Sequence, residues 1–178
     1  PAGKVVGTVS NEAARLCGLR PGVRLVSGGH DQCCNALGAG LVRPGQAVCG
    51  IGSFECLTPV YATIPEPARL LRHGLNIEHH VLPGLYVSFL YNQGGTLVKW
   101  FRDVFAAAEK ASGADVYARL NEEMPDEPTR LLVLPHFEMT GPPRFIADSA
   151  GVIVGLRTAT TRGEIFKAVL EGETFYFV

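Results

Sequence analysis

The chain has 178 residues, of which 47% are hydrophobic and 19% charged, and this composition is typical of a folded globular protein. The formal net charge of −1 provides no basic excess, which argues against nucleic acid or an anionic membrane surface as a partner. No run of about 18 apolar residues occurs, so the sequence predicts no membrane span.

The five cysteines are an odd number without C-x-x-C spacing, which favours small, mostly buried apolar side chains over disulfides or a metal site. They are Cys17, Cys33, Cys34, Cys49 and Cys56. Free thiols are typical of a reducing compartment, so we expect a cytoplasmic protein.

The first half of the chain alternates short apolar runs with a helical stretch, which predicts a mixed α/β fold. A short strand is expected over residues 23–26 and a helix over 31–41. Strand-like runs at 46–51 and 55–61 are joined by the small residues of 52–54, the pattern of a tight hairpin.

The middle of the chain predicts one strand and two helices. Residues 85–90 suit a strand, and apolar side chains recur at helical spacing over 96–108. Ser112 and Asp115 resemble a capping box at the start of a further helix that runs toward Met124.

The last part of the chain predicts two short strands, over 131–134 and 152–154, and a closing helix. Thr161 and Glu164 have the spacing of a capping box at the start of that helix, which is expected to continue to Val178. Because the first residues also read as the middle of an element, we expect both ends of the chain to be truncations.

Several familiar motifs are absent. No G-x-x-x-x-G-K-[ST] sequence occurs, residues 38–40 lack the third glycine of a dinucleotide loop, and Ser53 has no G-x-S-x-G frame. His79 and His80 are metal-binding residue types, but neighbours on a strand point to opposite faces, so we expect structural roles for them.

Two segments are candidates for chemistry. Asp31 follows Gly28 and Gly29 at a strand-to-helix junction, where the carboxylate either points into a cleft or caps the next helix. Gly52 and Ser53 form a small turn whose N–H groups either cradle phosphate oxygens or belong to an ordinary hairpin.

Taken in order, these pieces resemble the FGGY family of carbohydrate kinases over nearly the whole chain. The segments that carry the resemblance are E-A-A at 12–14, G-G-H-D-Q at 28–32, A-L-G-A-G at 36–40, G-S at 52–53, Q-G-G-T at 93–96, L-P at 134–135, and A-V-L-E-G at 168–172. Ser53 replaces the family's usual threonine, Phe54 replaces a small residue, and the Glu-Arg pair expected after Pro135 is absent.

The resemblance implies an actin-like ATPase, or ribonuclease-H-like, α/β fold with two domains. Residues 1–45 would form the carboxyl-terminal edge of the sugar-binding domain, and residues 46–178 would form the nucleotide-binding domain, incomplete at its end. On that expectation this chain alone would be inactive.

The resemblance also implies an ATP-dependent phosphorylation of a hydroxyl on a small sugar or polyol. Asp31 would be the catalytic base, would contact the substrate together with Gln32, and would reach Mg²⁺ through water. The ATP-binding residues would be Gly52, Ser53, Gly94 and Gly95.

Three readings therefore stay open at this stage. The first is the sugar kinase, the second an actin- or Hsp70-like ATPase without a sugar substrate, and the third a non-catalytic, degenerate kinase-like module. Family members are often dimers or tetramers, so a homodimer is compatible with the resemblance.

Overall fold

The computed structural model describes residues 2–177, which divide into two compact units. The first unit contains the chain up to Val48 together with Thr58–Leu71 and Asn76–Ser88. The second unit contains Cys49–Leu57, Arg72–Leu75 and the chain from Phe89 onward. The domain boundary expected near residue 45 stays a prediction.

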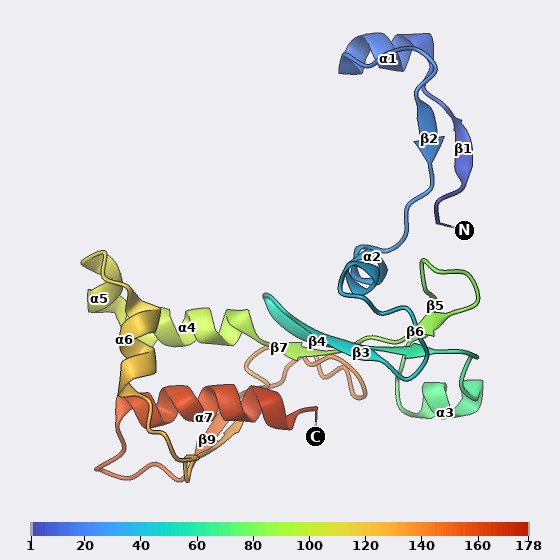
Figure 1. Cartoon of the computed structure of the whole chain (residues 1–178). Helices are drawn as coiled ribbons and strands as arrows, with labels where there is room; N and C mark the ends of the chain where they lie inside the picture. The colour runs from blue at the N-terminus through green and yellow to red at the C-terminus, as the bar shows by residue number, and fades with distance from the viewer. Residues whose placement is uncertain (1, 178) are drawn as a thin grey trace. The chain divides into compact units, whose positions relative to one another are not determined.

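The first unit begins with an antiparallel pair of strands, β1 (Val5–Thr8) and β2 (Arg24–Val26), which lie side by side in Figure 1. The connection between them contains α1 (Asn11–Cys17), which was not predicted. The Ser10 hydroxyl caps this helix by accepting a hydrogen bond from the Ala13 N–H at 3.2 Å. Only β2 had been expected from its apolar run.

The helix α2 (Asp31–Gly38) starts directly after the glycine pair and buries Cys33 and Ala36. The helix ends before the predicted residue 41. Gly40 has a φ of 86°, a left-handed backbone conformation that cannot continue an α-helix. His30, not Asp31, occupies the N-cap position, so the interpretation of Asp31 as the helix cap is wrong. Asp31 instead lies in the first turn, where a carboxylate interacts favourably with the helix dipole.

The strand β4 (Phe54–Tyr61) contributes to both units and confirms the predicted hairpin with β3 (Ala47–Ile51). Alternate residues of β4 are buried, as the period of a half-buried strand requires. Its beginning pairs with β7 (Leu90–Gln93) in the second unit. Its end pairs with β6 (Tyr86–Val87) in the first unit.

The predicted strand over 85–90 is therefore two separate short strands. In the first unit β6 also pairs with β5 (Glu78–His79), and α3 (Pro67–Arg72) precedes that pair. Neither α3 nor β5 was predicted.

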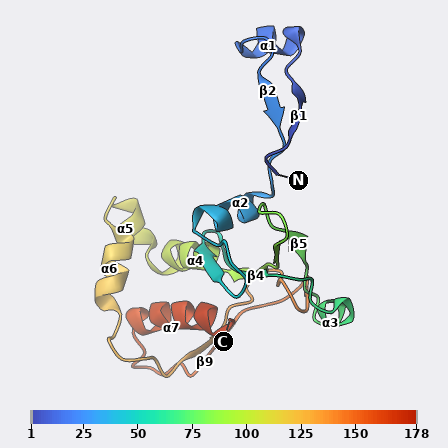
Figure 2. The same cartoon turned by 45° about the vertical axis from the view of Figure 1, so that its right-hand side comes forward.

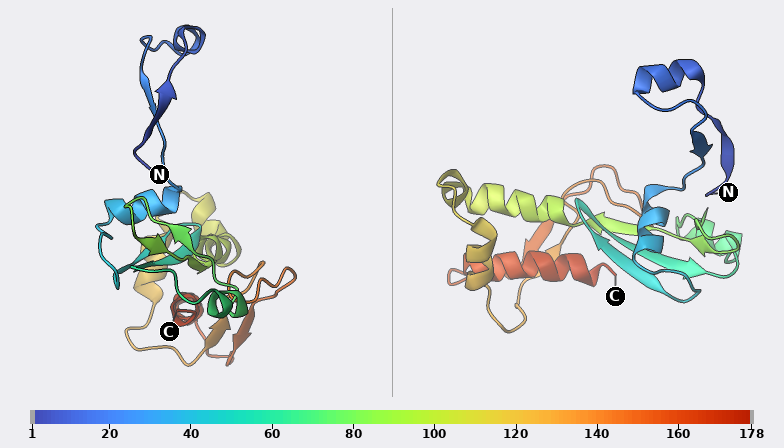
Figure 3. Two further views of the ribbon diagram at one scale, coloured as in Figure 1. Left: turned by 90° about the vertical axis from the view of Figure 1, so that its right-hand side faces the viewer. Right: turned by 45° about the horizontal axis from the view of Figure 1, so that its top comes forward.

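The second unit is built around three helices and a strand pair. The helix α4 (Gly95–Phe105) lies beside the closing helix α7 (Arg162–Phe175), with α6 (Val116–Glu123) packed against α7 near one end, as Figures 2 and 3 show. The strands β8 (Leu132–Leu134) and β9 (Val152–Val154) pair antiparallel and confirm two predictions. The core contains Leu97, Phe101, Val116, Leu120, Val133, Phe166 and Val169.

Two helix boundaries differ from the prediction. The helix expected over 96–108 breaks at Ala106, whose φ of −135° ends α4 before the short α5 (Ala107–Ala111) begins. Asp115 caps α6 by accepting a hydrogen bond from the Ala118 N–H at 3.0 Å, so the predicted cap at Ser112 is wrong. Ser112 instead follows the last residue of α5.

The capping box of α7 is confirmed, with hydrogen bonds in both directions between Thr161 and Glu164. The helix ends at Phe175, earlier than predicted. The predicted end at Val178 lies outside the described residues. The N–H groups of Tyr176 and Phe177 bond to carbonyls three residues back, which tightens the last turn.

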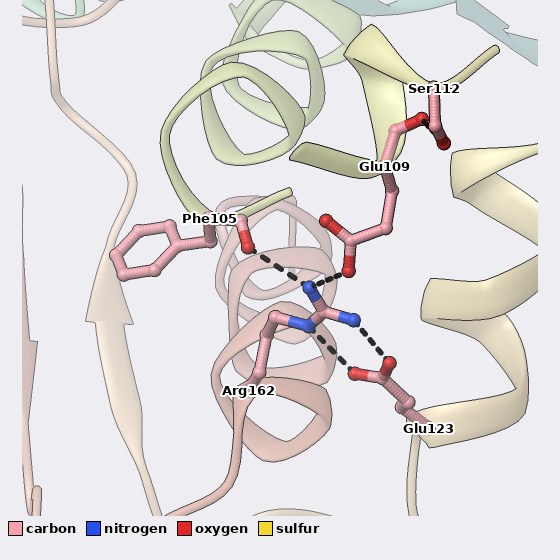
Figure 4. Close-up of polar contacts among 5 residues, drawn as sticks. All are labelled: Phe105, Glu109, Ser112, Glu123 and Arg162. Carbon is pink, nitrogen blue, oxygen red and sulfur yellow. Dashed lines mark hydrogen bonds and ion pairs between the residues drawn. The ribbon is translucent and has the colours of Figure 1, made fainter. Parts of the chain in front are cut away.

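An ionic cluster joins the start of α7 to the ends of its neighbouring helices (Figure 4). Arg162 donates to Glu123 from Nε at 2.8 Å and to Glu109 from Nη1 at 2.6 Å. The same Nη1 donates to the Phe105 carbonyl at 3.0 Å. These hydrogen bonds lower the pKa of both carboxyl groups, so the cluster is ionised at neutral pH.

The five cysteines only partly match their prediction. All are free thiols, but Cys17, Cys34 and Cys49 are exposed and only Cys33 and Cys56 are buried. Separately, none of the helices within residues 2–177 combines the length and the apolar character that a bilayer crossing requires.

A buried carboxyl group near the end of α7 makes the stability of the second unit depend on pH. Glu173 is 6% exposed and its Oε1 has no hydrogen-bond partner among the described residues. Burial, and then the nearby charge of Glu55, raise the pKa of Glu173 from 4.5 to about 8. The folded protein therefore holds this proton more tightly than the unfolded chain does.

We expect the wild type to lose stability as pH rises from 4.5 to about 8, because Glu173 must then give up its proton. Glu173→Gln should abolish that loss. The sign follows because the native state binds more protons than the unfolded state throughout that window. Melting temperatures at about pH 6 and about pH 9 check it, with Glu122→Gln on the exposed face of α6 as control. An equal drop in the melting temperatures of wild type and Glu173→Gln would contradict the assignment.

Candidate functional site

Asp31 lies at the start of α2 with its side chain 89% exposed. Its Oδ1 accepts a hydrogen bond from the Gln32 N–H at 2.7 Å and lies 3.1 Å from the His30 Nε2. These two contacts fix one carboxylate oxygen. The carboxylate is therefore both accessible to a small substrate and held in one orientation.

Gly29 allows another segment to approach the chain just before Asp31. A Cβ at this position would lie 2.3 Å from the Cγ1 of Val81, closer than real Cβ contacts occur. Only glycine leaves room for that side chain without a shift. The predicted importance of the glycine pair thus has a steric cause at Gly29.

An open pocket of about 580 Å³ borders the same segment of the first unit. Its lining residues are Ala2, Ser27, Gly28, Gly29, His79, His80, Val81, Pro83 and Gly84. Asp31 and Gln32 are not among them. The pocket is large enough for a small polar molecule, and its wall begins two residues before the carboxylate.

The two adjacent histidines have different environments. His79 packs against Tyr86 with ring centroids 5.1 Å apart. His80 is buried, its Nδ1 accepts from the Leu82 N–H at 2.9 Å, and burial lowers its pKa, which favours the neutral ring. These contacts fit the predicted structural roles.

His30 places a second acidic residue beside the Asp31 segment. Its Nδ1 lies 3.1 Å from the Oε2 of Glu78, so the imidazole stands between two carboxylates. The 48 residues that separate His30 from Glu78 explain why sequence reasoning missed this contact. No local pattern marks Glu78.

The predicted phosphate turn is in the second unit. Gly52 donates its N–H to the Phe54 carbonyl at 2.9 Å, and Ser53 is exposed. The Ser53 hydroxyl makes no hydrogen bond with any residue in 2–177. That hydroxyl is a donor suited to a phosphate oxygen.

The turn is fastened to the beginning of α4. The Gly95 N–H donates to the Gly52 carbonyl at 2.8 Å, and the Thr96 N–H and hydroxyl donate to the Ser53 carbonyl at 3.1 and 2.9 Å. The Gly94 N–H also points to the Ser53 carbonyl, at 3.3 Å. Both glycine N–H groups are thus occupied, so their contribution to a nucleotide site would be steric.

The close approach of the Gly52–Ser53 turn to the start of α4 explains why Gly94 and Gly95 are both glycine. A Cβ at Gly95 would lie 2.4 Å from the Gly52 carbonyl oxygen, and one at Gly94 would lie 2.9 Å from the Glu55 nitrogen. Thr96 was part of the motif that carried the resemblance, but its hydroxyl bond to the turn was not foreseen. The segment Gly94-Gly95-Thr96 therefore holds the Gly52–Ser53 turn against the start of α4.

Phe54, the bulky residue that departs from the family pattern, turns toward Tyr91 on the neighbouring strand. Their rings meet edge to face with centroids 6.0 Å apart. The side chain is accommodated on β4 itself, because this contact uses the strand pair rather than the turn.

Comparisons with known proteins found curated relatives over about two thirds of the chain. The chain is 37% identical over 129 residues to autoinducer-2 kinase of Escherichia coli K12, an alignment that covers 67% of this chain and 23% of that protein. It is 35% identical over 128 residues to autoinducer-2 kinase of Yersinia enterocolitica, again over 67% and 23%. No family model matches the chain.

Solved structures cover nearly the whole chain. Xylulose kinase from Rhodospirillum rubrum superposes with a TM-score of 0.78 and 29% identity, over 99% of this chain and 35% of that one. Gluconate kinase from Lactobacillus acidophilus gives a TM-score of 0.75 at 19% identity, over 97% and 34%. These likenesses confirm the actin-like ATPase fold.

The fold is thus of the actin-like ATPase class. Within it, the chain belongs to the FGGY family of carbohydrate kinases. It spans 23% of the length of the curated relatives and about a third of the solved neighbours.

Proposed function

We propose that the protein transfers the γ-phosphoryl group of ATP to a hydroxyl group of a small sugar or polyol. The observation that carries this proposal is the exposed, oriented carboxylate of Asp31 at the start of α2, next to a pocket. A base in that position can accept the proton of an attacking hydroxyl. The relatives, all named as kinases of small molecules, support the same reaction.

Asp31 would act on the substrate hydroxyl as its oxygen attacks phosphorus. Phosphoryl transfer has a loose transition state in most analyses, so positioning and charge stabilisation matter more than a strong base. The contacts from Gln32 and His30 hold one carboxylate oxygen still, which suits that positioning task. Gln32 is the neighbouring candidate for a substrate contact.

The phosphate groups of ATP would meet residues of the second unit. Ser53 would donate its hydroxyl to a phosphate oxygen, while Gly94 and Gly95 keep the turn against α4. Mg²⁺, when bound, neutralises charge on the phosphates. The exposed oxygen of Asp31 is suited to meet that ion through a water molecule.

The division of labour that we propose is the one expected from the resemblance. Residues 1–45 would belong to the sugar-binding domain and residues 46–178 to the nucleotide-binding domain. The five free cysteines support a cytoplasmic location, since such thiols persist in a reducing compartment. A homodimer is the assembly that the family resemblance favours.

The test is ADP release by the complete gene product with Mg-ATP and a panel of acceptors. The names of the relatives supply the first members of the panel, which are autoinducer-2, xylulose and gluconate. Release that depends on one acceptor confirms the kinase. Release at the same rate without any acceptor supports the ATPase reading, and no release from a folded, ATP-binding protein supports the non-catalytic module.

A further inference from the structure

Three side chains of metal-binding type meet beside Asp31. One ligand atom each from His30, Cys33 and Glu78 lies within 4.8 Å of the other two. The His30 Nδ1 and the Glu78 Oε2 are 3.1 Å apart. A tetrahedral zinc site holds its ligand atoms about 3.3–3.8 Å apart, because its bonds are about 2.0–2.3 Å long.

The fold brings these residues together from two stretches of the chain. His30 occupies the N-cap of α2 and Cys33 lies one turn later, so both face the same side of the helix start. Glu78 comes from β5, and the Asn76 Nδ2 donates to its Oε1 at 3.4 Å. The other carboxylate oxygen of Glu78, Oε2, is the one that faces His30.

We propose that His30, Cys33 and Glu78 form a binding site for a transition-metal dication of the zinc type. An imidazole nitrogen, a thiolate and a carboxylate are the ligand types that Zn²⁺ prefers, whereas Mg²⁺ prefers oxygen ligands alone. The site is therefore separate in chemistry from the Mg²⁺ that accompanies ATP.

Charge balance favours a dication at this place. A thiolate and a carboxylate carry two negative charges, which a divalent cation neutralises in a partly buried site. On binding, the sulfur–hydrogen bond of Cys33 breaks, a sulfur–metal bond forms and the proton leaves to solvent. The His30 Nδ1 and the Glu78 carboxylate add two bonds, and water completes the tetrahedron.

The thiol needs such a cation to ionise. Cys33 is fully buried, and its Sγ donates a weak hydrogen bond, 3.7 Å long, to the His79 carbonyl. Burial first, and the charge of Glu78 second, raise the pKa of Cys33 to about 11. A bound dication reverses the effect of the neighbouring charge.

Metal binding would also act on Asp31, a consequence that rests on the proposed kinase function. With the metal on Nδ1, the His30 ring keeps its proton on Nε2, which lies 3.1 Å from the Asp31 Oδ1. Histidines that bind metals commonly donate their other N–H to a carboxylate in this way. The positive charge of the ion would compete with the substrate hydroxyl for that carboxylate, so zinc should inhibit the kinase.

The first experiment titrates Co²⁺, a spectroscopic substitute for Zn²⁺, into the complete gene product. We expect a thiolate-to-cobalt charge-transfer band that saturates at one ion per chain, disappears in Cys33→Ser and survives in Cys56→Ser, the matched buried cysteine. Zn²⁺ should displace Co²⁺, and excess Mg²⁺ should not. Absence of the band in the wild type, or its survival in folded Cys33→Ser, overturns the site.

A second variant protects the test against misfolding. Glu78→Gln keeps the size of a half-buried side chain and removes one charge, so we expect Co²⁺ affinity to fall at least about 10-fold. Unchanged affinity in Glu78→Gln overturns the assignment of this ligand. Melting curves show whether each variant is folded.

The activity arm measures ADP release with saturating Mg-ATP while a metal buffer holds free Zn²⁺ constant. Wild type and Cys56→Ser should be inhibited, and Cys33→Ser should lose the inhibition relative to its own zinc-free rate. Zinc that binds without inhibiting overturns the coupling through Asp31. If no acceptor supports turnover, the proposed kinase function fails, whereas the cobalt band still decides the metal site.

Discussion

Asp31→Asn in the complete gene product is expected to lower kcat by about 10²–10⁴-fold, the usual contribution of a general base. The amide keeps the shape of the carboxylate and can still accept the hydrogen bond from the Gln32 N–H. It cannot take up a proton from an attacking hydroxyl. The KM for ATP should change little, because the proposed phosphate-binding residues are elsewhere in the chain.

The control for Asp31→Asn must remove a similar charge without touching the site. Glu12 is an exposed acid in the first turn of α1, and so Glu12→Gln removes the same favourable interaction with a helix dipole. That interaction contributes about 0.3–1 kcal/mol, so neither variant should unfold. Initial rates with the best acceptor decide the matter, and near-normal turnover of Asp31→Asn would refute the base assignment.

The sequence could predict the elements whose signals are local. The capping box of Thr161 and Glu164 marks the start of α7, because both hydrogen bonds form within one turn of helix. The small residues Gly52 and Ser53 mark the hairpin for a similar reason, since a tight turn needs little else. Such features depend on residues nearby in the chain, so they can be predicted without knowledge of the fold.

Tertiary packing decided the boundaries that were missed. Alanine favours helix, so nothing local announces the break at Ala106, which is 1% exposed and packs in the core of the second unit. Likewise β5 has only the two residues Glu78–His79 and exists through its pairing with β6. An isolated dipeptide carries no strand signal.

The candidate site likewise combines residues that local sequence predicts with a contact that only the tertiary fold creates. Asp31 and the turn at Gly52–Ser53 could be selected from their neighbours and from family resemblance. The contact of His30 with Glu78 could not, because it joins α2 to a distant strand. Gly95 was selected as a nucleotide contact, and the structure adds that its N–H already serves the turn.

Gly95→Ala is expected to raise the KM for ATP by about 5- to 150-fold. The new Cβ would lie 2.4 Å from the carbonyl oxygen of Gly52, and this partner is backbone with no flexible end that can move aside. Overpacking of this kind costs about 1–3 kcal/mol, and a cost carried by ATP binding translates into that loss of affinity. The turn would have to leave the start of α4, taking the Ser53 hydroxyl with it.

The matched variant is Gly52→Ala in the same turn. Its Cβ would meet only the Phe54 carbonyl oxygen at 3.9 Å, an ordinary contact, so a much smaller change in KM is expected. ATP affinity by calorimetry and melting temperature, measured on both variants, separate loss of the nucleotide site from loss of the fold. Equal ATP affinities in Gly95→Ala and Gly52→Ala would show that the close approach of α4 to the turn does not govern nucleotide binding. A selective loss in Gly95→Ala would instead mean that this glycine serves ATP by its size, because its N–H is already bonded to the Gly52 carbonyl.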